Sequence, residues 1–446
     1  MSRRDTALRY YNEQKELTET RVNSGIELYR KGNVNITVKD KDGNLVKGAK
    51  VFVNHKNHEF RFGANVFMLD EFECEEKNVK YREDFAKLFN LATIPFYWSD
   101  LEPEQGKPRY SVDSPKIYRR PATDLCVNYC LEKGIEPKCH CLNYDNFTPD
   151  WAKNVDIATQ KKMLTERFRS LSERYADIIP TWEVTNETLQ GFNAPRTKFY
   201  FEEDFLDWSF RMADRYFPNN RLIINDYYIF DWCHFMNDRS AYYMQIKDLL
   251  SRGISHLDSI GMQYHSFFPL IEEEKFAYTR YNPEHLYNVF DRYADLGKSL
   301  QITEMTIPAY SGEAEDEEIQ AELLCNFYKV CFSHPAMEAI IYWNLVDGYA
   351  AFAPQGDMTA GENKFFGGLM RFDMTKKPAY DALYNLIHKE WHTELETGTD
   401  ESGTASFRGF YGDYELEITV DGKKYTKAIS TSRDKLNQFT IKLSEN

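Results

Sequence analysis

The chain has 446 residues, of which 42% are hydrophobic and 28% are charged. This composition is typical of a globular protein and excludes long disordered stretches. Its formal net charge of −15 at pH 7 repels phosphate backbones and anionic lipid, so neither nucleic acid nor a membrane is an expected partner, and a neutral substrate is favoured.

The first 60 residues predict a helix followed by two strands. Residues 1–32 are mostly polar, with an apolar stripe at Val22, Ile26 and Tyr29 that indicates an N-terminal helix docked on the main body. Residues 33–60 alternate as two β-strands around a turn at 40–44. Two strands are not stable alone, so this segment needs a partner.

Residues 61–392 alternate short apolar runs with longer amphipathic stretches, which is the rhythm of repeated βα units. Helices are expected between the runs, for example at 157–175 and 205–216. A (β/α)8 barrel needs roughly 250 residues, so the segment is long enough for one. The eight predicted strands are 62–66, 88–94, 135–142, 178–187, 222–225, 259–263, 300–304 and 339–343.

A second β-rich block, residues 393–446, closes the chain. We predict that it pairs with residues 33–60, because neither block has enough strands to be stable alone. The predicted fold class is therefore α/β, a (β/α)8 TIM barrel with a small accessory β-sandwich built from the N- and C-terminal segments. We expect the sandwich to brace the two ends of the barrel rather than to bind ligand.

Two buried strands of the predicted barrel end on carboxylates, Glu187 and Glu304. The carboxyl ends of barrel strands meet at one face, where barrel enzymes carry out their chemistry. A pair of carboxylates facing each other there is typical of a glycosidase, with one as proton donor and the other as nucleophile. The alternative interpretation of Asn186 and Glu187 is that they cap the N-terminus of a helix and have no catalytic role.

Other polar and aromatic side chains fall at the ends of the same strands. Asn186 could hydrogen-bond a sugar 2-hydroxyl, a contact that strengthens in the transition state. His140, His265 and Gln263 offer hydrogen-bond donors to an ionised nucleophile, although a single histidine is more often a core residue. Trp343 could form the floor of a sugar pocket, with core packing as the alternative.

The cysteines and the apolar runs predict neither a metal site nor a membrane span. Cys139 and Cys141 flank His140 within a predicted strand, so the thiols would face away from the imidazole, which is poor zinc geometry. We therefore expect no metal and no cofactor. Without an apolar leader the expected location is the cytoplasm with reduced thiols, and a leader trimmed from the chain would instead mean a secreted protein.

In combination, these motifs resemble glycoside hydrolase family 10, the β-1,4-xylanase family, over about residues 60–390. The resemblance implies a (β/α)8 barrel and retention of anomeric configuration, with Glu187 as acid/base and Glu304 as nucleophile. It also implies a set of residues that bind the substrate: Asn186, His140, Gln263, His265, Trp343, Tyr227 and Trp98. The motifs that carry it are Gly63-Ala64, His140, Thr148-Pro-Asp-Trp151, Trp182 to Glu187, Asn225-Asp-Tyr227, Gly261 to His265, Ile302-Thr-Glu304, Trp343 and Lys377-Pro-Ala-Tyr380.

The chain departs from the family pattern at three places. After the second strand the family usually has Glu-Asn and then Lys-Trp, which hold the neighbouring xylose, but residues 93–98 lack those polar groups. The usual Trp-His after His140 is Tyr144-Asp145, and the Asp that follows the nucleophile is Thr306. We therefore predict a rebuilt neighbouring subsite and an altered hydrogen-bond relay through His265.

The leading hypothesis is a retaining glycoside hydrolase that cleaves β-1,4-xylosidic linkages in xylan or xylo-oligosaccharides by double displacement. One alternative keeps this mechanism but acts on short or aryl β-glycosides instead of polymeric xylan. A second alternative is a non-catalytic carbohydrate-binding protein, which the presence of both glutamates disfavours. In each case the expected partner is an oligo- or polysaccharide, and the chain is expected to be a monomer.

Overall fold

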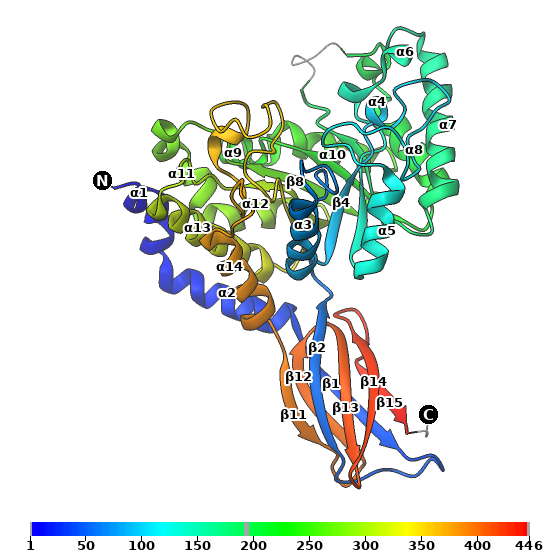
Figure 1. Ribbon diagram of the computed structural model, residues 1–446, viewed down its shortest axis with the longest axis vertical. Coiled ribbons are helices and arrows are strands. Elements are labelled where there is room, and N and C mark those ends of the chain that lie inside the picture. Colours follow the sequence, from blue (N-terminus) through cyan, green and yellow to red (C-terminus); the bar gives the residue numbers. More distant parts are fainter. Residues whose placement is uncertain (1, 191–195, 444–446) are drawn as a thin grey trace.

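The computed structural model describes residues 2–190 and 196–443 of the chain. It consists of a rounded body of helices around a barrel and a narrower β-domain that extends from it (Figure 1). Among the described residues, none of the helices combines the length and apolar character that crossing a bilayer requires.

Eight parallel strands form a closed barrel in the order β10-β3-β4-β5-β6-β7-β8-β9. Each overlaps one of the predicted strands, so the TIM-barrel prediction is confirmed. The strands are buried because helices cover the outside of the barrel while side chains fill its inside. Their bounds are β3 Arg61–Asn65, β4 Leu91–Pro95, β5 Glu136–His140, β6 Thr181–Asn186, β7 Arg221–Asp226, β8 Ser259–His265, β9 Ser299–Thr306 and β10 Met337–Tyr342.

The helices around the barrel begin and end at recognisable signals. Asp156 caps α7 by accepting a hydrogen bond from the Thr159 N–H (3.0 Å), Gly134 ends α5 at φ 67°, and Pro378 begins α14. The helices are α3 Glu75–Leu88, α4 Trp98–Leu101, α5 Thr123–Lys133, α6 Asp150–Lys153, α7 Ile157–Tyr175, α8 Phe205–Tyr216, α9 Ile229–Met236, α10 Ala241–Ser251, α11 Glu273–Tyr281, α12 Pro283–Ala294, α13 Ala314–Ser333 and α14 Pro378–Asn385.

The N-terminal segment forms two helices, α1 (Arg3–Glu13) and α2 (Lys15–Tyr29), where the sequence predicts one. The break is at Gln14, whose backbone leaves the helical region. Val22 and Ile26 are buried as the apolar stripe predicts. A Cβ at Gly25 would lie 2.3 Å from the Ser333 carbonyl oxygen, so this glycine lets α2 approach α13 closely.

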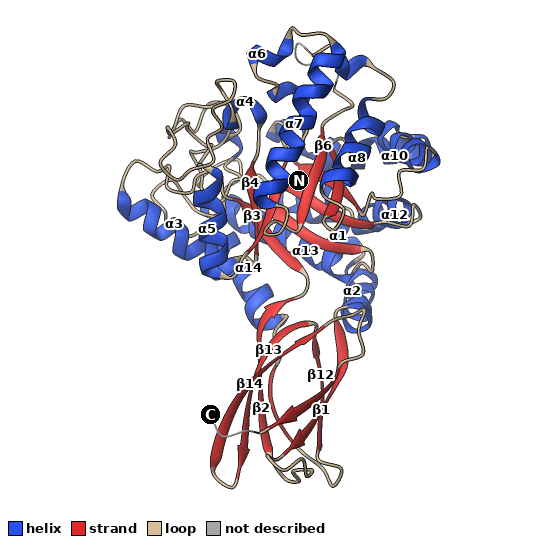
Figure 2. Cartoon of the chain, turned by 90° about the vertical axis from the view of Figure 1, so that its right-hand side faces the viewer, coloured by secondary structure: helices blue, strands red, loops and turns tan. Residues whose placement is uncertain are grey.

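The β-domain consists of two sheets with strand orders β12-β1-β15 and β11-β2-β13-β14 (Figure 2). Each sheet combines strands from both ends of the chain, so the predicted accessory sandwich is confirmed. Alternate side chains of its strands pack into a separate apolar core that includes Ile36, Val53 and Leu416. The strands are β1 Lys31–Lys39, β2 Lys50–His58, β11 Glu394–Gly398, β12 Thr404–Phe410, β13 Gly412–Val420, β14 Lys423–Thr431 and β15 Gln438–Lys442.

Candidate active site

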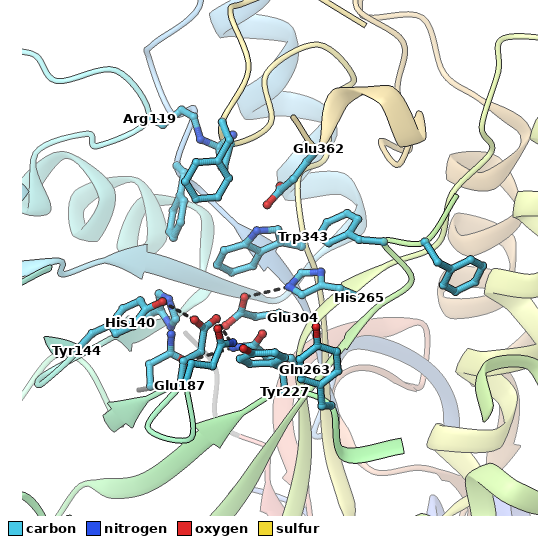
Figure 3. Close-up of a pocket in the computed structure, with 18 of the residues that line it drawn as sticks. Arg119, His140, Tyr144, Glu187, Tyr227, Gln263, His265, Glu304, Trp343 and Glu362 are labelled. Atoms are coloured by element: carbon cyan, nitrogen blue, oxygen red, sulfur yellow. Dashed lines mark hydrogen bonds and ion pairs between the residues drawn. The ribbon is translucent and has the colours of Figure 1, made fainter. Parts of the chain in front are cut away.

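A cavity of about 470 Å³ lies at the carboxyl ends of the barrel strands (Figure 3). The structure brings together there all the predicted site residues except one: Glu187, Glu304, Asn186, His140, Gln263, His265, Trp343 and Tyr227 line it. This position follows from the parallel barrel, in which every strand ends at the same face.

Trp98 is the exception. The strand β4 ends at Pro95 and α4 begins at Trp98, and this turn carries the ring to the other side of the segment. Trp98 packs edge-on against Trp151 with ring centroids 5.3 Å apart and lines a second cavity. Its neighbour Tyr97 lines the active-site cavity instead.

Glu304 lies near the end of β9, almost completely buried, and two side chains hold its carboxylate. Asn225 Nδ2 donates to Oε1 at 2.9 Å, and His265 Nε2 lies 3.2 Å from Oε2. Burial raises the pKa of Glu304 to about 8, and the Glu187 carboxylate adds to this effect, whereas the charge of His140 opposes it. An empty site therefore keeps a proton on this carboxylate pair at neutral pH.

Glu187 follows β6 and is half-buried. Its backbone has φ 51°, which is uncommon for a residue with a side chain, and its N–H donates to the Asn225 carbonyl at 3.1 Å. The Tyr144 hydroxyl donates to Oε2, and Gln263 Nε2 donates to Oε1 at 3.1 Å. The carboxylate thus faces the same space as that of Glu304 (Figure 3).

Side-chain amides link the two glutamates. Asn186 Oδ1 accepts from Asn225 Nδ2 at 2.8 Å and from Gln263 Nε2 at 3.2 Å. Since Asn225 also contacts Glu304 and Gln263 also contacts Glu187, this chain of contacts fixes the carboxylates relative to each other. Asn225 is a site residue that the predicted set omitted, although the sequence motif contained it.

His140 belongs to a fully buried ionic group. Its Nδ1 and the Lys138 ammonium both bond to the Glu183 carboxylate, and its Nε2 lies 2.9 Å from the Tyr97 hydroxyl. Burial alone would lower the pKa of His140, but the charge of Glu183 and its hydrogen bond outweigh burial and raise it. Both ring nitrogens are therefore engaged by protein groups.

His265 is neutral, because burial lowers its pKa to about 4. A neutral imidazole has one N–H and one acceptor nitrogen. With Nε2 donating to Glu304, Nδ1 accepts from the Thr306 hydroxyl at 3.1 Å. The threonine that replaces the usual aspartate thus still orients the ring, but adds no negative charge behind it.

The loop from Asn344 to Lys377, which follows β10, forms the upper edge of the cavity in Figure 3. It contributes Glu362, a third carboxyl group whose pKa burial raises. Asn344 Nδ2 donates to Glu362 Oε2 at 3.0 Å, and Arg119 Nη2 donates to Asn344 Oδ1 at 3.0 Å. Sequence reasoning missed Glu362 and Arg119 because they lie in loops far from any strand end, and it missed Asn344 although this residue directly follows the predicted strand 339–343.

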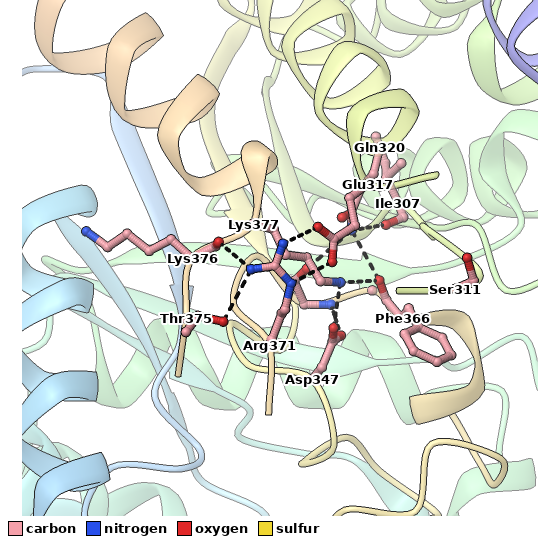
Figure 4. A network of polar contacts seen from close by, with 12 residues as sticks. Ile307, Ser311, Glu317, Gln320, Asp347, Phe366, Arg371, Thr375, Lys376 and Lys377 are labelled. Atoms are coloured by element: carbon pink, nitrogen blue, oxygen red, sulfur yellow. Dashed lines mark hydrogen bonds and ion pairs between the residues drawn. The ribbon is translucent and has the colours of Figure 1, made fainter. Parts of the chain in front are cut away.

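A buried polar network anchors this loop to the barrel (Figure 4). The Lys377 ammonium lies 2.5 Å from Asp347 Oδ2 and donates to the Phe366 carbonyl at 2.8 Å. Asp347 Oδ1 accepts from the Gly368 N–H at 2.7 Å. These contacts join the two ends of the loop to each other, and Arg371 pairs with Glu317 of α13, which ties the loop to the body.

No group of three or more histidine, cysteine or acidic side chains within the described part of the chain has an arrangement that would hold a metal ion.

Comparison with known proteins identifies the family. Glycosyl hydrolase family 10 matches residues 57–386. Relatives include the anti-sigma-I factor RsgI6 of Acetivibrio thermocellus, 25% identical over 92% of this chain and 48% of that protein. Another is endo-1,4-beta-xylanase 1 of Arabidopsis thaliana, 24% identical over 92% of this chain and 39% of that protein. The chain spans less than half the length of these two relatives.

The fold is shared with solved structures. Native xylanase 10B from Thermotoga maritima superposes with a TM-score of 0.59 at 23% identity, covering 74% of this chain and 96% of that one. Xylanase 10B from Thermotoga petrophila, solved in complex with xylobiose, gives the same TM-score and identity over 95% of its length. A match over most of the chain, a closed barrel and two carboxylates at its mouth agree: the chain belongs to glycosyl hydrolase family 10.

Proposed function

We propose that this chain is a retaining glycoside hydrolase that cleaves β-1,4-xylosidic linkages in xylo-oligosaccharides or xylan by double displacement. The observation that carries the proposal is the pair Glu187 and Glu304, which face one cavity from β6 and β9 and are linked through side-chain amides. The relatives named as xylanases and the neighbour solved with xylobiose support a xylose-based substrate.

In the first step, Glu187 protonates the glycosidic oxygen while Glu304 attacks the anomeric carbon and forms a glycosyl-enzyme. We assign the nucleophile to Glu304 because Asn225 and His265 hold both of its oxygens. Glu187 is the more exposed of the two, so it can reach a leaving group and later a water molecule.

In the second step, Glu187 accepts a proton from water, which attacks the glycosyl-enzyme and releases the sugar with its original configuration. The cycle needs one proton on the carboxylate pair. The raised pKa of Glu304 means that the empty site already keeps one proton. The reactive form of the pair has Glu304 ionised and the proton on Glu187, because positive charge develops at the adjacent anomeric carbon in the transition state.

The remaining residues would hold the sugar next to the scissile bond. Asn186 uses Oδ1 for Asn225 and Gln263, so its amide nitrogen is the donor to a sugar hydroxyl. Trp343 supplies an aromatic face, fixed edge-on between Phe67, 5.1 Å away, and His265, 5.9 Å away. Tyr227, after β7, lines the same cavity on the other side of Glu187.

The test is a pair of variants. Glu304→Ala should abolish turnover of every substrate, because no covalent intermediate can form. Glu187→Ala should slow xylo-oligosaccharide hydrolysis by about 10²- to 10⁴-fold and slow aryl β-xylosides with good leaving groups much less. Glu274→Ala, at an exposed acidic residue of α11, is the matched control and should keep wild-type rates. Full activity of Glu304→Ala would contradict the assignment.

The stereochemical course needs its own measurement. Proton NMR of the first sugar released should show the β-anomer before mutarotation, and the α-anomer as first product would contradict double displacement. Calorimetric binding of xylohexaose by the wild-type protein without release of any reducing sugar would instead support the non-catalytic carbohydrate-binding alternative.

One observation favours short substrates over polymeric xylan. Where the family usually holds the second xylose with polar side chains, this cavity has the buried ring of Tyr97, bonded to His140. A comparison of rates on xylan, xylobiose to xylohexaose and aryl β-xylosides tests this preference, and polymer as the best substrate would reject it.

A further inference from the structure

One end of the cavity is closed by four side chains in mutual contact, here called the end wall: Phe67, Tyr97, Arg120 and Phe147. The rings of Tyr97 and Phe147 stack with centroids 4.0 Å apart. The Arg120 guanidinium lies 4.4 Å from the centre of the Tyr97 ring and 5.4 Å from that of Phe67. These contacts leave the end wall continuous across the loops after β3, β4 and β5.

The end wall is held rigidly from behind. Arg120 Nε donates to Asp100 Oδ2 at 2.7 Å, and the Tyr97 hydroxyl lies 2.9 Å from His140 Nε2. Phe67 is 1% exposed and Tyr97 is 6% exposed. These two rings have little rotamer freedom, so bound sugar would not displace them without a large energetic cost, whereas Phe147 and Arg120 are partly exposed.

The loop after β10 meets the end wall from above. Arg119, next to Arg120, donates to the Tyr349 carbonyl and to Asn344 Oδ1 at 3.0 Å. Because the Lys377–Asp347 pair joins the two ends of this loop and Arg371 ties it to α13, the contact closes the corner between the end wall and the upper edge of the cavity.

The other end of the cavity has a different character. Of the described residues that line the cavity away from the end wall, Tyr228, after β7, is 50% exposed. Rings with open faces of this kind can stack on successive sugar units. A glycan can therefore extend in only one direction from the catalytic glutamates.

The chemistry of double displacement determines which part of the substrate lies at each end. The leaving group has to depart from the glycosyl-enzyme, and water has to take its place beside Glu187. Both movements require a path to solvent, so the leaving group occupies the open end. The sugar that bonds to Glu304 occupies the closed end.

We infer that only one sugar unit fits between Glu304 and the end wall, because His140 and Trp343 each lie next to the Glu304 site on one side and next to the end wall on the other. The His140 charge acts on the Glu304 carboxylate while its Nε2 contacts Tyr97. The Trp343 ring lies 5.9 Å from that of His265, the partner of Glu304, and 5.1 Å from that of Phe67. The side chains that border the sugar next to Glu304 are therefore in direct contact with the end wall.

We propose that this chain acts from the non-reducing end of short oligosaccharides and releases one terminal sugar per cleavage, with the end wall as the determinant. This inference rests on the proposed glycosidase function and specifies its substrate class and mode of action. The bond that breaks is the one between the terminal sugar and its neighbour. Water supplies the hydroxyl group and the proton, so no further reactant is needed.

The test uses xylohexaose reduced to its alditol, which marks the reducing end. The first marked product should be the alditol one unit shorter, with xylose as the only unmarked sugar, and shorter alditols should follow in order. Early formation of short marked alditols together with xylobiose or xylotriose would overturn the proposal. Absence of hydrolysis of both xylohexaose and aryl β-xylosides would instead reject the proposed function itself.

Variants test the end wall. Tyr97→Ala should add xylobiose to the first products, because it opens space for a second sugar beyond Glu304. Phe147→Ala is the second variant, since it opens the end wall without touching His140, and it should shift the products in the same direction. Tyr216→Ala, on the outer helix α8, is the matched control and should release xylose alone. A folded, active Phe147→Ala enzyme that still releases only xylose would contradict the role of the end wall.

Discussion

As the proposed nucleophile, Glu304 has to meet two requirements that oppose each other. A nucleophile has to be ionised when it attacks, yet its burial and the nearby Glu187 carboxylate favour the protonated form and raise its pKa to about 8. The contacts from Asn225 and His265 offset part of this penalty. The proton that Glu304 holds at neutral pH therefore has to leave its carboxyl group before that group can attack.

The first prediction concerns the pH dependence of the rate. Because the pair has to carry one proton, kcat/KM on an unactivated xylo-oligosaccharide should fall as the pH rises through about 8, the pKa of Glu304 in the free enzyme. Initial rates between pH 5 and pH 10 would check this. A rate that stays constant up to pH 10 would contradict it.

The second prediction concerns stability. The pKa of Glu304 is raised above its ordinary value of 4.5, so its contribution to folding is present at low pH and is lost as the pH rises from about 4.5 through about 8. Glu304→Gln removes the buried charge and should raise Tm, with a larger gain at pH 8 than at pH 5. Thermal unfolding at both pH values tests this, and an equal or lower Tm at pH 8 would refute it.

At the scale of single residues, the sequence predicts which side chains lie at strand ends but not which other side chains contact them. Glu187, Glu304, His265 and Gln263 were identifiable because a buried apolar run leads directly to each. The Tyr144 contact with Glu187 depends on how loops from different strands meet, and local sequence does not contain that information. For the same reason the sequence predicts Trp98 in the cavity, whereas the structure places its neighbour Tyr97 there.

Among the elements, the loop after β10 depends on one buried ion pair. Lys377 and Asp347 are 1% and 6% exposed, and Lys377 also bonds the Phe366 carbonyl. Removing one partner of such a pair leaves the other charged and buried, which typically costs about 3–5 kcal/mol. The pair therefore determines whether the upper edge of the cavity keeps its shape.

The third prediction follows for Lys377→Met. The free energy of unfolding should fall by about 3–5 kcal/mol, and KM should rise because Glu362 and Phe352 lie in the loop that loosens. Urea unfolding and steady-state kinetics would measure the two effects. Lys364→Met, at an exposed position of the same loop, is the control. It should change the free energy of unfolding by no more than about 0.5 kcal/mol and should leave KM at the wild-type value. Equal stability of the two variants would contradict the role given to the pair.

Helices and strands are predicted well from the sequence where the pattern of apolar residues is strong. All eight barrel strands follow apolar runs in the sequence. Their starts are less well predicted: the run 178–187 forms a strand only from Thr181, because Pro180 lacks an N–H for the ladder. The break at Gln14 between α1 and α2 is a consequence of docking on α11 and α13, which no local signal indicates.

Considered as a whole, the molecule joins its barrel and its sandwich through a junction rich in histidine. His55, His58, His388 and His392 line one cavity between the two parts. Burial lowers the pKa of each of them, that of His55 to about 4. The imidazoles are thus neutral in the folded protein and sit too close together to be charged at the same time.

The fourth prediction is loss of stability in mild acid. A histidine with a lowered pKa contributes stability that is present above its unfolded value of about 6.5 and is lost as the pH falls from there towards about 4. Tm should therefore drop between pH 7 and pH 4.5, and His55→Phe should reduce the drop. The same drop in wild type and His55→Phe would show that the junction is not responsible.

The pairing of the two chain ends could be predicted because each block alone has too few strands. The strand order within the sandwich could not, since β1 lies between β12 and β15 while β2 lies between β11 and β13, and alternation alone fits many such orders.

Interleaving of this kind has a consequence for biosynthesis. The strands β1 and β2 are made before the barrel, but the strands that pair with them, β11, β12, β13 and β15, are made after it. The barrel can fold while these two strands wait with unpaired edges, which are prone to associate with other chains. Synthesis of these later strands ends the exposure, so the nascent chain is most vulnerable to aggregation in the interval between synthesis of β2 and synthesis of β11 to β15.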